Sequence, residues 1–247
     1  MKKILINYAA LGTNHAHNQP NRGYVNAQIL NSQTGINIAG FNEVINYNPT
    51  KLPSSFFSEH EKHFKYTRGA GYWIWKPFII LDALQKIQND DILMYSDSGC
   101  HFINSINYIL PRLDLTANKI LVFNLAQIEK DWTKRDCFIE LKCDTPEFTD
   151  SKQIMSTFFL CRKSIFSIDF VNQWYKTCSN FHMVADEFIS PSKTKNYDSF
   201  KEHRHDQSIL SLVSKLNKID YMEDITEWGD PIKRKTPQIV KHTRKRD

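Results

Sequence analysis

The sequence predicts an α/β fold in which helices cover both faces of a mostly parallel central sheet, and three observations lead to this class. Short apolar runs of strand length alternate with longer segments in which apolar residues recur every three to four positions. Hydrophobic residues make up 41% of the 247 residues, which is ample for a packed core. No repeat, low-complexity segment or linker divides the chain, so we expect one domain over residues 1–247.

The first half of the chain is expected to contain three strands and four helices. Apolar runs predict strands at residues 3–9, 43–47 and 92–97. Helical spacing of apolar residues predicts helices at residues 24–32, 54–66, 77–87 and 104–113. Pro77 suits this assignment, because proline is tolerated in the first turn of a helix.

The second half continues the alternation with longer polar stretches between the elements. Strands are expected at residues 119–125, 156–162 and 238–242, and helices at 164–178 and 206–216. The polar stretch at about 126–150 is expected to be a long loop or a partly ordered insertion, and that at about 190–205 a second loop. Residues 233–247 are expected to form a basic tail. Such alternation is typical of a parallel sheet.

Charge and cysteine content limit the class of partner and the compartment. The net charge is +5, and the basic tail suits anionic partners such as phosphates, acidic lipid headgroups or nucleic acid, unless it is merely solvated. The five cysteines are scattered without a CxxC pair, which favours a reducing cytosol over a disulfide framework or zinc ribbon. No apolar stretch reaches the length of a membrane span. We expect a cytoplasmic protein, with peripheral contact to the inner face of the cell membrane left open.

The first candidate site is the stretch "DDILMYSDSGC", in which Asp97 follows an apolar run. Ligands of open α/β sheets bind outside the carboxyl ends of the strands, where Asp97 would lie. Ser98 and Gly99 leave little side-chain bulk there. Mg²⁺ or Mn²⁺ takes oxygen ligands and often only one or two from protein. The alternative is an ordinary Asp-Ser-Gly turn in which the carboxylate accepts hydrogen bonds from backbone amides.

The second candidate is "RGAGYWIWKPFIILDAL", where Arg68 and Lys76 flank a cluster of aromatic residues. Cations beside a helix start suit a pyrophosphate group, and Trp75 or its aromatic neighbours suit a base or a sugar. The alternative is that the tryptophans belong to the core and the cations are solvated.

Two further stretches near the C-terminus carry candidate polar residues. In "EHRHDQSILSLV", Asp206 stands where a helix N-cap belongs, beside Gln207 and two histidines, so it is either a cap or a functional carboxylate. In "IVKHTRKR", His242 is a candidate metal ligand, unless it belongs to a solvated basic tail. His15 and His17 are expected to lie in a loop.

In this order, "GYWIWKPFIILDAL", "DDILMYSDSGC" and "HRHDQSILSLV" resemble a bacterial family of GT-A-type sugar-nucleotide glycosyltransferases associated with capsule, lipopolysaccharide and other surface glycans. The resemblance runs from about Tyr66 to His242. It implies a single GT-A (Rossmann-like) domain that binds a nucleotide-sugar donor, above all a UDP-sugar. It also implies a glycan or lipid-linked acceptor.

The resemblance also implies roles for individual residues. The family's Asp-x-Asp metal motif falls on Asp97-Ser98-Gly99, and Gly99 stands where the second acid would be. Asp97 is therefore carried over as the ligand of Mn²⁺ or Mg²⁺, with His242 as the candidate second ligand. The implied donor-binding residues are Arg68, Trp75, Lys76, Asp97, Ser98, Gly99 and Gln207. Asp206 is the implied catalytic residue, either a base in an inverting reaction or a group that orients the sugar in a retaining one.

Two other functions compete with a glycosyltransferase. A metal-dependent phosphoesterase or nucleotidyltransferase would also use acids at strand ends, but such enzymes normally place several carboxylates around two metals. A nucleic-acid-binding module would use the basic tail and the aromatic residues, but the positive charge is modest and no nucleic-acid-binding motif is found. We therefore expect no nucleic-acid partner.

Overall fold

The computed structural model describes residues 1–10, 22–186 and 191–243. Its centre is a six-stranded sheet with the strand order β2-β1-β3-β6-β5-β7. Five strands run in one direction and β6 runs in the other, so the sheet is mostly parallel. The strands are β1 (Lys3–Tyr8), β2 (Glu43–Tyr47), β3 (Ile92–Ser96), β5 (Ile120–Ile128), β6 (Lys152–Arg162) and β7 (Tyr221–Met222).

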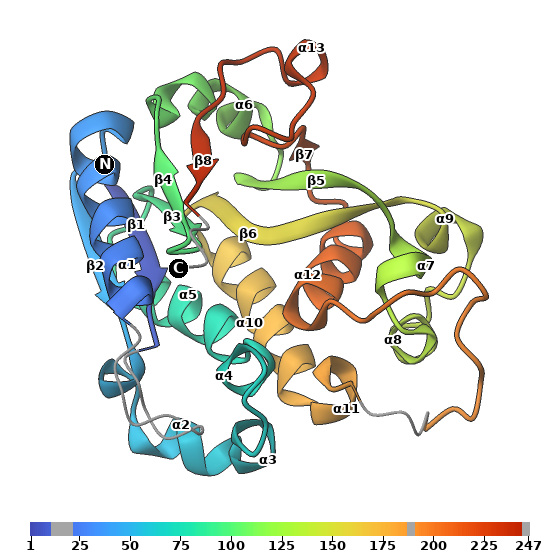
Figure 1. Cartoon of the computed structure of the whole chain (residues 1–247). Helices are drawn as coiled ribbons and strands as arrows, with labels where there is room; N and C mark the ends of the chain where they lie inside the picture. The colour runs from blue at the N-terminus through green and yellow to red at the C-terminus, as the bar shows by residue number, and fades with distance from the viewer. Residues whose placement is uncertain (11–21, 187–190, 244–247) are drawn as a thin grey trace.

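One face of the sheet is covered by long helices. These are α5 (Trp75–Lys86), α10 (Ile165–Ser179) and α12 (His205–Leu216), and Figure 1 shows them side by side below the strands. Residues such as Ile6, Leu93 and Phe159 point from the sheet into this layer. Ser164 begins α10 with a capping box shared with Ser167, in which each side chain hydrogen-bonds the other's backbone amide.

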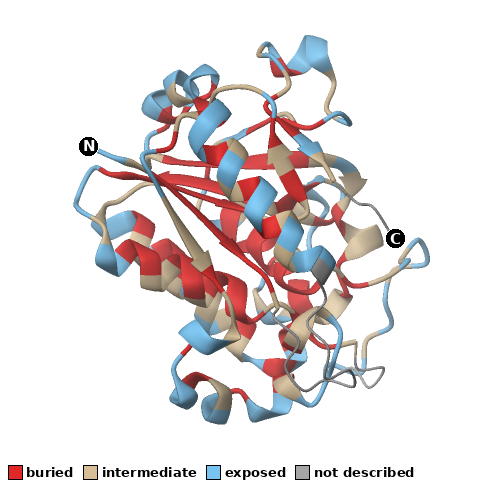
Figure 2. Ribbon diagram, turned by 60° about the vertical axis from the view of Figure 1, so that its left-hand side comes forward, coloured by how far each residue is buried: buried red, intermediate tan, exposed pale blue. Residues whose placement is uncertain are grey.

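The other face is covered by one long helix and several shorter elements. They are α1 (Arg22–Thr34), η1 (Gly35–Ala39), η3 (Ile106–Tyr108), α6 (Leu110–Leu115) and a small antiparallel sheet of β4 (Cys100–Phe102) and β8 (Val240–His242). Leu5, Met94 and Phe158 pack into this second layer. The strands between the two layers form the band of buried residues in Figure 2. The predicted α/β class, with helices on both faces of a mostly parallel sheet, is confirmed.

Asn7 joins α1 to the central sheet through buried polar contacts. Its side-chain amide donates to Asn31 Oδ1 at 2.8 Å, and its oxygen accepts from Gln28 at 3.0 Å. Asn31 in turn donates to Ser96 Oγ at 3.0 Å and to the carbonyl of Cys100 at 2.9 Å. These bonds satisfy an amide inside an apolar strand and fix α1 against the end of β3.

The predicted loop at 126–150 was wrong. Strand β5 extends to Ile128, and α7 (Glu129–Trp132), α8 (Arg135–Glu140) and α9 (Pro146–Thr149) follow it. The basic tail is also partly ordered, because it contains the end of α13 (Pro231–Arg234) as well as β8, while residues 244–247 lie outside the described residues. Of the expected loop at 190–205, the described residues 191–204 form no helix or strand. His15 and His17 also lie outside the described residues.

Two predicted helices are interrupted for local reasons. The expected helix at 54–66 is divided into α2 (Ser54–Glu59) and α3 (Glu61–Phe64), because His60 leaves helical geometry with φ −114° and ψ 27°. The expected helix at 104–113 is a 3₁₀ turn followed by α6. Pro111 lies in the first turn of α6, and proline has no amide with which to continue a helix from η3.

The remaining short elements lie between or after these. They are η2 (Pro49–Lys51), α4 (Gly69–Tyr72) and α11 (Phe181–Val184). None of the helices in the described ranges is both long and apolar enough to cross a membrane.

Candidate functional site

Lys76 lies in the first turn of α5 and brings three separate segments together. Its Nζ lies 3.2 Å from Asp97 Oδ1, beyond the end of β3, and 3.2 Å from Asp206 Oδ2, at the start of α12. It also donates to the carbonyl and the Oγ of Ser156 in β6, at 3.2 and 3.1 Å. We call Lys76, Asp97 and Asp206 the Lys76 cluster. Its members come from three stretches that the sequence singled out.

The three charged groups differ in their access to solvent. The side chain of Lys76 is 2% exposed and that of Asp206 is 4% exposed, whereas that of Asp97 is 37% exposed. The cluster therefore presents one carboxylate to solvent and keeps the other behind a buried ammonium. A ligand that arrives at this surface meets Asp97 first.

The exposed position of Asp97 follows from the strand before it. All five residues of β3 are buried, so the carboxylate emerges as soon as the strand ends. The hydroxyl of Tyr95 donates to Asp97 Oδ1 at 2.5 Å, and Ser98 Oγ donates to the carbonyl of Tyr8 at 2.6 Å. The amide of Cys100 donates to the carbonyl of Asp97 at 3.2 Å, which closes a turn. The predicted turn is therefore present, but the carboxylate faces Tyr95 and Lys76.

Open space lies beside this turn at Gly99. Among the described residues, a Cβ built on Gly99 would meet no atom within 4 Å apart from its chain neighbours, and the backbone there does not adopt a positive φ. The fold therefore does not require glycine at this position. The small residue leaves room next to Asp97 for a ligand to approach the backbone.

The charges of the Lys76 cluster stabilise one another against burial. Burial is the largest effect on the pKa of Lys76 and would lower it, but Asp206 and Asp97 outweigh burial and the pKa is raised. Burial also raises the pKa of Asp206, although Lys76 opposes that shift. With all three groups ionised, two carboxylates surround one ammonium, so the cluster carries an excess negative charge. This favours a cationic ligand at the exposed carboxylate.

Asp206 does not act as the helix cap that its position suggested. Helix α12 begins at His205, and Arg204 occupies the N-cap without a side-chain hydrogen bond. Asp206 is the second residue of the helix, and its carbonyl accepts a hydrogen bond from Trp174 Nε1 at 3.1 Å. The capping interpretation is therefore wrong, and the carboxylate is held by Lys76.

Gln207 belongs to a buried polar network on the other side of Asp206. Its Nε2 donates to Gln153 Oε1 at 2.8 Å, and its Oε1 accepts from the amide of Ser156 at 3.3 Å. Gln153 Nε2 donates to Glu129 Oε1 at 3.0 Å, and Ser211 and Lys215 bond to the second oxygen of Glu129. The network fixes α12 to β6 and α7.

Trp75 is part of the core. Its ring stacks on that of Tyr8, with centroids 3.8 Å apart and planes 17° apart, and its Nε1 donates to the carbonyl of Gly69 at 2.9 Å. Trp75 is buried, as expected from the alternative in which the tryptophans belong to the core. Through Tyr8 it supports the carbonyl that accepts from Ser98.

The backbone before α5 is strained. Ala70, Tyr72 and Trp73 have φ values of 50°, 55° and 58°, in the left-handed region that side chains disfavour. Each such residue costs about 1–3 kcal/mol. The strained turn precedes Lys76 directly and sets where α5 begins. Strain of this kind is concentrated at functional sites.

Arg68 lies on the rim of a separate cavity. It pairs with Asp186 at 3.3 Å and Glu202 at 3.4 Å. The cavity has a volume of about 730 Å³, and Lys134 and His203 also line it. Asp186 Oδ1 is also 3.7 Å from His205 Nε2. Asp186 therefore connects Arg68 to His205, the first residue of α12. Burial lowers the pKa of His205 to about 4, so its imidazole is neutral at pH 7.

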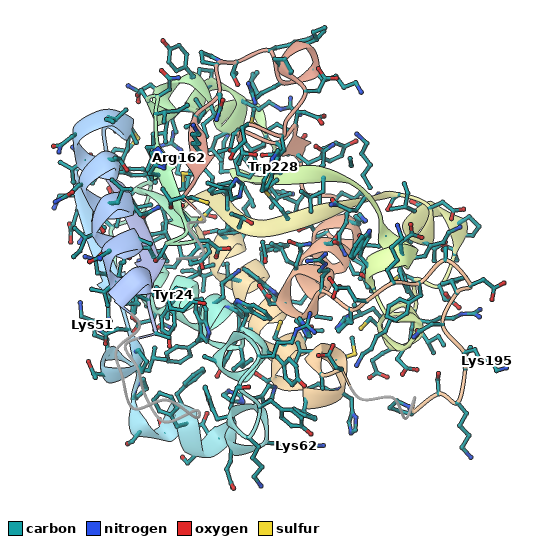
Figure 3. The ribbon with its side chains drawn as sticks, in the orientation of Figure 1. Tyr24, Lys51, Lys62, Arg162, Lys195 and Trp228 are labelled. Carbon is teal, nitrogen blue, oxygen red and sulfur yellow. The ribbon has the colours of Figure 1, made fainter. Side chains whose placement is uncertain are left out.

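Strand β8 places His242 next to the turn that contains Asp97. His242 pairs with Cys100 in the small sheet, and the amide of Thr243 donates to the carbonyl of Gly99 at 2.9 Å. The imidazole Nδ1 lies 3.3 Å from Glu227 Oε2, and the ring stacks on Trp228 with centroids 4.2 Å apart. Figure 3 labels Trp228 beside this strand. The pairing places His242 at the end of the sheet where Asp97 lies, and its ring faces Glu227 and Trp228.

The residues present would give a divalent cation only part of its coordination shell. Within the described residues, no group of three or more histidine, cysteine, aspartate or glutamate side chains is arranged to hold a metal ion. Asp97 supplies an exposed carboxylate oxygen, and the cluster supplies excess negative charge. Mg²⁺ and Mn²⁺ often bind through one or two carboxylates and complete their shell with substrate phosphates and water. The site therefore fits a cation that binds together with a phosphorylated substrate.

Several residues of the site carried no signal in the sequence. Ser156 and Gln153 lie in a strand, and Glu129 lies in a segment expected to be a loop. Tyr95 lies in an apolar run, and nothing in the sequence indicates its contact with Asp97. Their contacts join positions far apart in the chain, which a single sequence does not reveal.

Comparisons with known proteins identify no family. No protein-family model matches the chain, and no curated protein matches it. A solved structure that resembles it is the apo form of mouse xyloside xylosyltransferase 1, with a TM-score of 0.45 and 13% sequence identity, over 89% of this chain and 83% of that chain.

Proposed function

We propose that this protein is a metal-assisted glycosyltransferase that moves a sugar from a nucleotide diphosphate sugar to an acceptor hydroxyl. One observation carries the proposal: a buried lysine is held between an exposed carboxylate at a strand end and a buried carboxylate at a helix start. The exposed carboxylate suits a cation and the diphosphate that accompanies it. The buried pair behind it provides fixed charges that do not need to reorganise during a reaction.

The donor-side roles follow from the exposure of each group. Asp97 would hold Mn²⁺ or Mg²⁺, with His242 as the candidate second ligand from β8. A bound cation offsets the charge that builds on the departing diphosphate. Gly99 and Ser98 leave space for the donor beside Asp97. Lys76 sets the direction of the Asp97 carboxylate, and Trp75 supports the turn through Tyr8.

The burial of Asp206 favours one of its two candidate roles. A base that deprotonates an acceptor hydroxyl needs an oxygen that the acceptor can reach. The Asp206 side chain is 4% exposed and its Oδ2 is held 3.2 Å from Lys76. We therefore infer that Asp206 orients Lys76, with Gln207 beside it. This role does not require Asp206 to be the base of an inverting reaction.

The partners follow from the same proposal. We take a UDP-sugar as the donor and a glycan or lipid-linked hydroxyl as the acceptor, in the synthesis of capsule, lipopolysaccharide or a related bacterial surface glycan. Arg68 lies in the neighbouring cavity with Lys134 and is the candidate cation for an acidic part of either substrate. The proposal places the enzyme in the cytoplasm, with its basic C-terminal segment facing the anionic inner membrane surface.

A thermal-shift screen tests the proposal. The wild-type protein is heated with UDP, GDP, CDP and ADP, each with and without Mn²⁺. A ligand at a hundred times its dissociation constant stabilises by about 2.7 kcal/mol, which corresponds to roughly 5–10 °C in a domain of this size. We expect one nucleotide to give such a shift only with Mn²⁺, and Asp97→Asn to lose it.

A control variant distinguishes binding at Asp97 from non-specific binding of ions to surface carboxylates. Asp150→Asn removes an exposed carboxylate that pairs with Lys130 at 2.6 Å, and it should keep the nucleotide shift. A shift that survives Asp97→Asn, or no shift with any nucleotide, would contradict the proposed function.

A further inference from the structure

A second cavity lies at the end of α12 that is far from Asp206. Its volume is about 750 Å³. It is lined by residues of α6, α9, β7, the last turn of α12 and parts of β5 and β6. It shares no lining residue with the Lys76 cluster or with the cavity that contains Arg68. We call it the α12 cavity.

Among the described residues, two buried polar atoms in the wall of the α12 cavity have no hydrogen-bond partner. They are Asn124 Oδ1 in β5 and Ser214 Oγ in α12. Asn124 is 4% exposed and Ser214 is 1% exposed. Buried polar groups are nearly always paired, because leaving one unpaired is costly. Two such groups in one cavity wall indicate that a polar ligand supplies their missing hydrogen bonds.

The rim of the same cavity is cationic. Four cations and two acids line it, which leaves an excess of two positive charges. Arg112 pairs with Asp220 at 3.3 Å, and Lys215 pairs with Glu129 behind the wall. Lys152 and Lys218 are exposed and make no ion pair in the described part of the chain. The remaining acid of the rim is Glu147.

Apolar side chains supply the rest of the lining. Phe148, Ile154, Ile219 and Tyr221 line the cavity beside the polar atoms. Sites for small molecules typically combine such walls with a few polar groups that fix orientation. A sugar ring offers both apolar C–H faces and hydroxyl groups, and an attached anion would match the free lysines.

We propose that the α12 cavity binds an anionic saccharide, either a uronic acid or a sugar phosphate. Its anionic group faces Lys152 and Lys218, its hydroxyl groups bond with Asn124 and Ser214, and its ring packs on Phe148 and Tyr221. This proposal does not depend on the function proposed for the Lys76 cluster.

Binding measurements with three probes test the proposal. Isothermal titration with glucuronate, glucose 6-phosphate and glucose distinguishes a carboxylate, a phosphate and no charge. We expect at least one anionic probe to bind the wild-type protein and glucose to bind at least about tenfold more weakly, because two lysines lose their counter-ion. The stronger anionic probe identifies the source of the charge.

Variants locate the binding in this cavity. Lys152→Gln with Lys218→Gly should weaken the anionic probe about tenfold. Glycine suits position 218, where φ is 52°. Ser214→Ala should weaken it about fivefold while the melting temperature stays unchanged or rises, because the hydroxyl has no partner in the fold. Lys51→Gln, at an exposed lysine far from the cavity (Figure 3), and Asp97→Ala should both keep full affinity.

Three outcomes would overturn the proposal. They are equal affinity for glucose and both anionic probes, unchanged affinity in the Lys152→Gln, Lys218→Gly double variant, and loss of affinity in Asp97→Ala. Loss of the nucleotide shift without any change in saccharide binding would affect only the proposed function.

Discussion

Replacing Lys76 with methionine tests whether the lysine neutralises a buried carboxylate. Methionine matches the length and apolar stem of lysine but leaves Asp206 buried without its cation. Removing one partner of a buried ion pair costs about 3–5 kcal/mol. The side chain of Asp97 is 37% exposed, so water screens its share of the loss. We therefore expect the free energy of unfolding at pH 7.5 to fall by about 3–5 kcal/mol.

This loss should depend on pH in a defined direction. The pKa of Asp206 is already raised above 3.8 by burial, and without Lys76 it should rise further. A carboxyl group whose pKa is raised in the folded state costs stability as pH rises from 3.8 through that folded pKa, since ionisation is disfavoured in the fold. The stability difference between wild type and Lys76→Met should therefore be smaller at pH 4.5 than at pH 7.5.

Urea unfolding at these two pH values measures the effect, with two companion variants. Lys76→Met combined with Asp206→Asn removes the orphaned charge and should recover about 1–3 kcal/mol relative to Lys76→Met alone. Lys134→Met is the matched control, because Lys134 is also buried but donates to the carbonyl of Ala185 at 2.7 Å. Its loss should be nearly the same at both pH values. A pH-independent loss in Lys76→Met, with no recovery in the double variant, would refute the ion-pair reasoning.

Four further substitutions probe the rest of the site. Asp97→Ala should abolish sugar transfer and also lower the melting temperature, because the buried Tyr95 hydroxyl loses its acceptor and buried Lys76 loses one of its two carboxylates; full activity would exclude its role as metal and donor anchor. Asp206→Asn should lower kcat with nucleotide binding kept, and a bell-shaped pH–rate profile that loses its acidic limb would identify a base instead of an orienting group. Gly99→Ala should leave stability within about 0.5 kcal/mol, because its Cβ meets open space, but should weaken donor binding in calorimetry; unchanged binding would place the donor elsewhere. Glu129→Leu should cost about 3–5 kcal/mol of unfolding free energy in urea, because Lys215 loses its buried partner; a loss below about 1 kcal/mol would show that the network is not held by charge.

The sheet and its long helices could be predicted because their patterns are local. Strand β2 matches its predicted bounds, β3 and α12 differ from theirs by one residue at one end, and α10 differs by one residue at each end. The three helices in residues 129–149 have only four to six residues each. Isolated helices of that length are not stable in water, so tertiary packing decides them and no periodicity marks them. The two-residue strand β7 was missed for the same reason.

The sequence predicted the charged residues of the candidate site but not the residues that hold them in place. Lys76, Asp97 and Asp206 stood out because charged residues next to apolar runs are unusual. The structure adds that they touch one another. Ser156, which accepts from Lys76, looks like any polar residue of a strand. Trp75 looked available for stacking, because the sequence cannot show that Tyr8 covers it.

The different exposure of the two carboxylates explains how one lysine can serve both. A lysine shared equally by two buried acids would leave a buried negative charge, which the fold would have to neutralise by raising a pKa. Here solvent reaches Asp97, so the excess charge lies at the surface, where water or a bound cation stabilises it. The charge of Asp97 contributes to the raised pKa of Asp206. A cation bound at Asp97 would offset that charge, so the pKa of Asp206 would fall. Binding at the strand end would then favour the ionised form of the carboxyl group at the helix start.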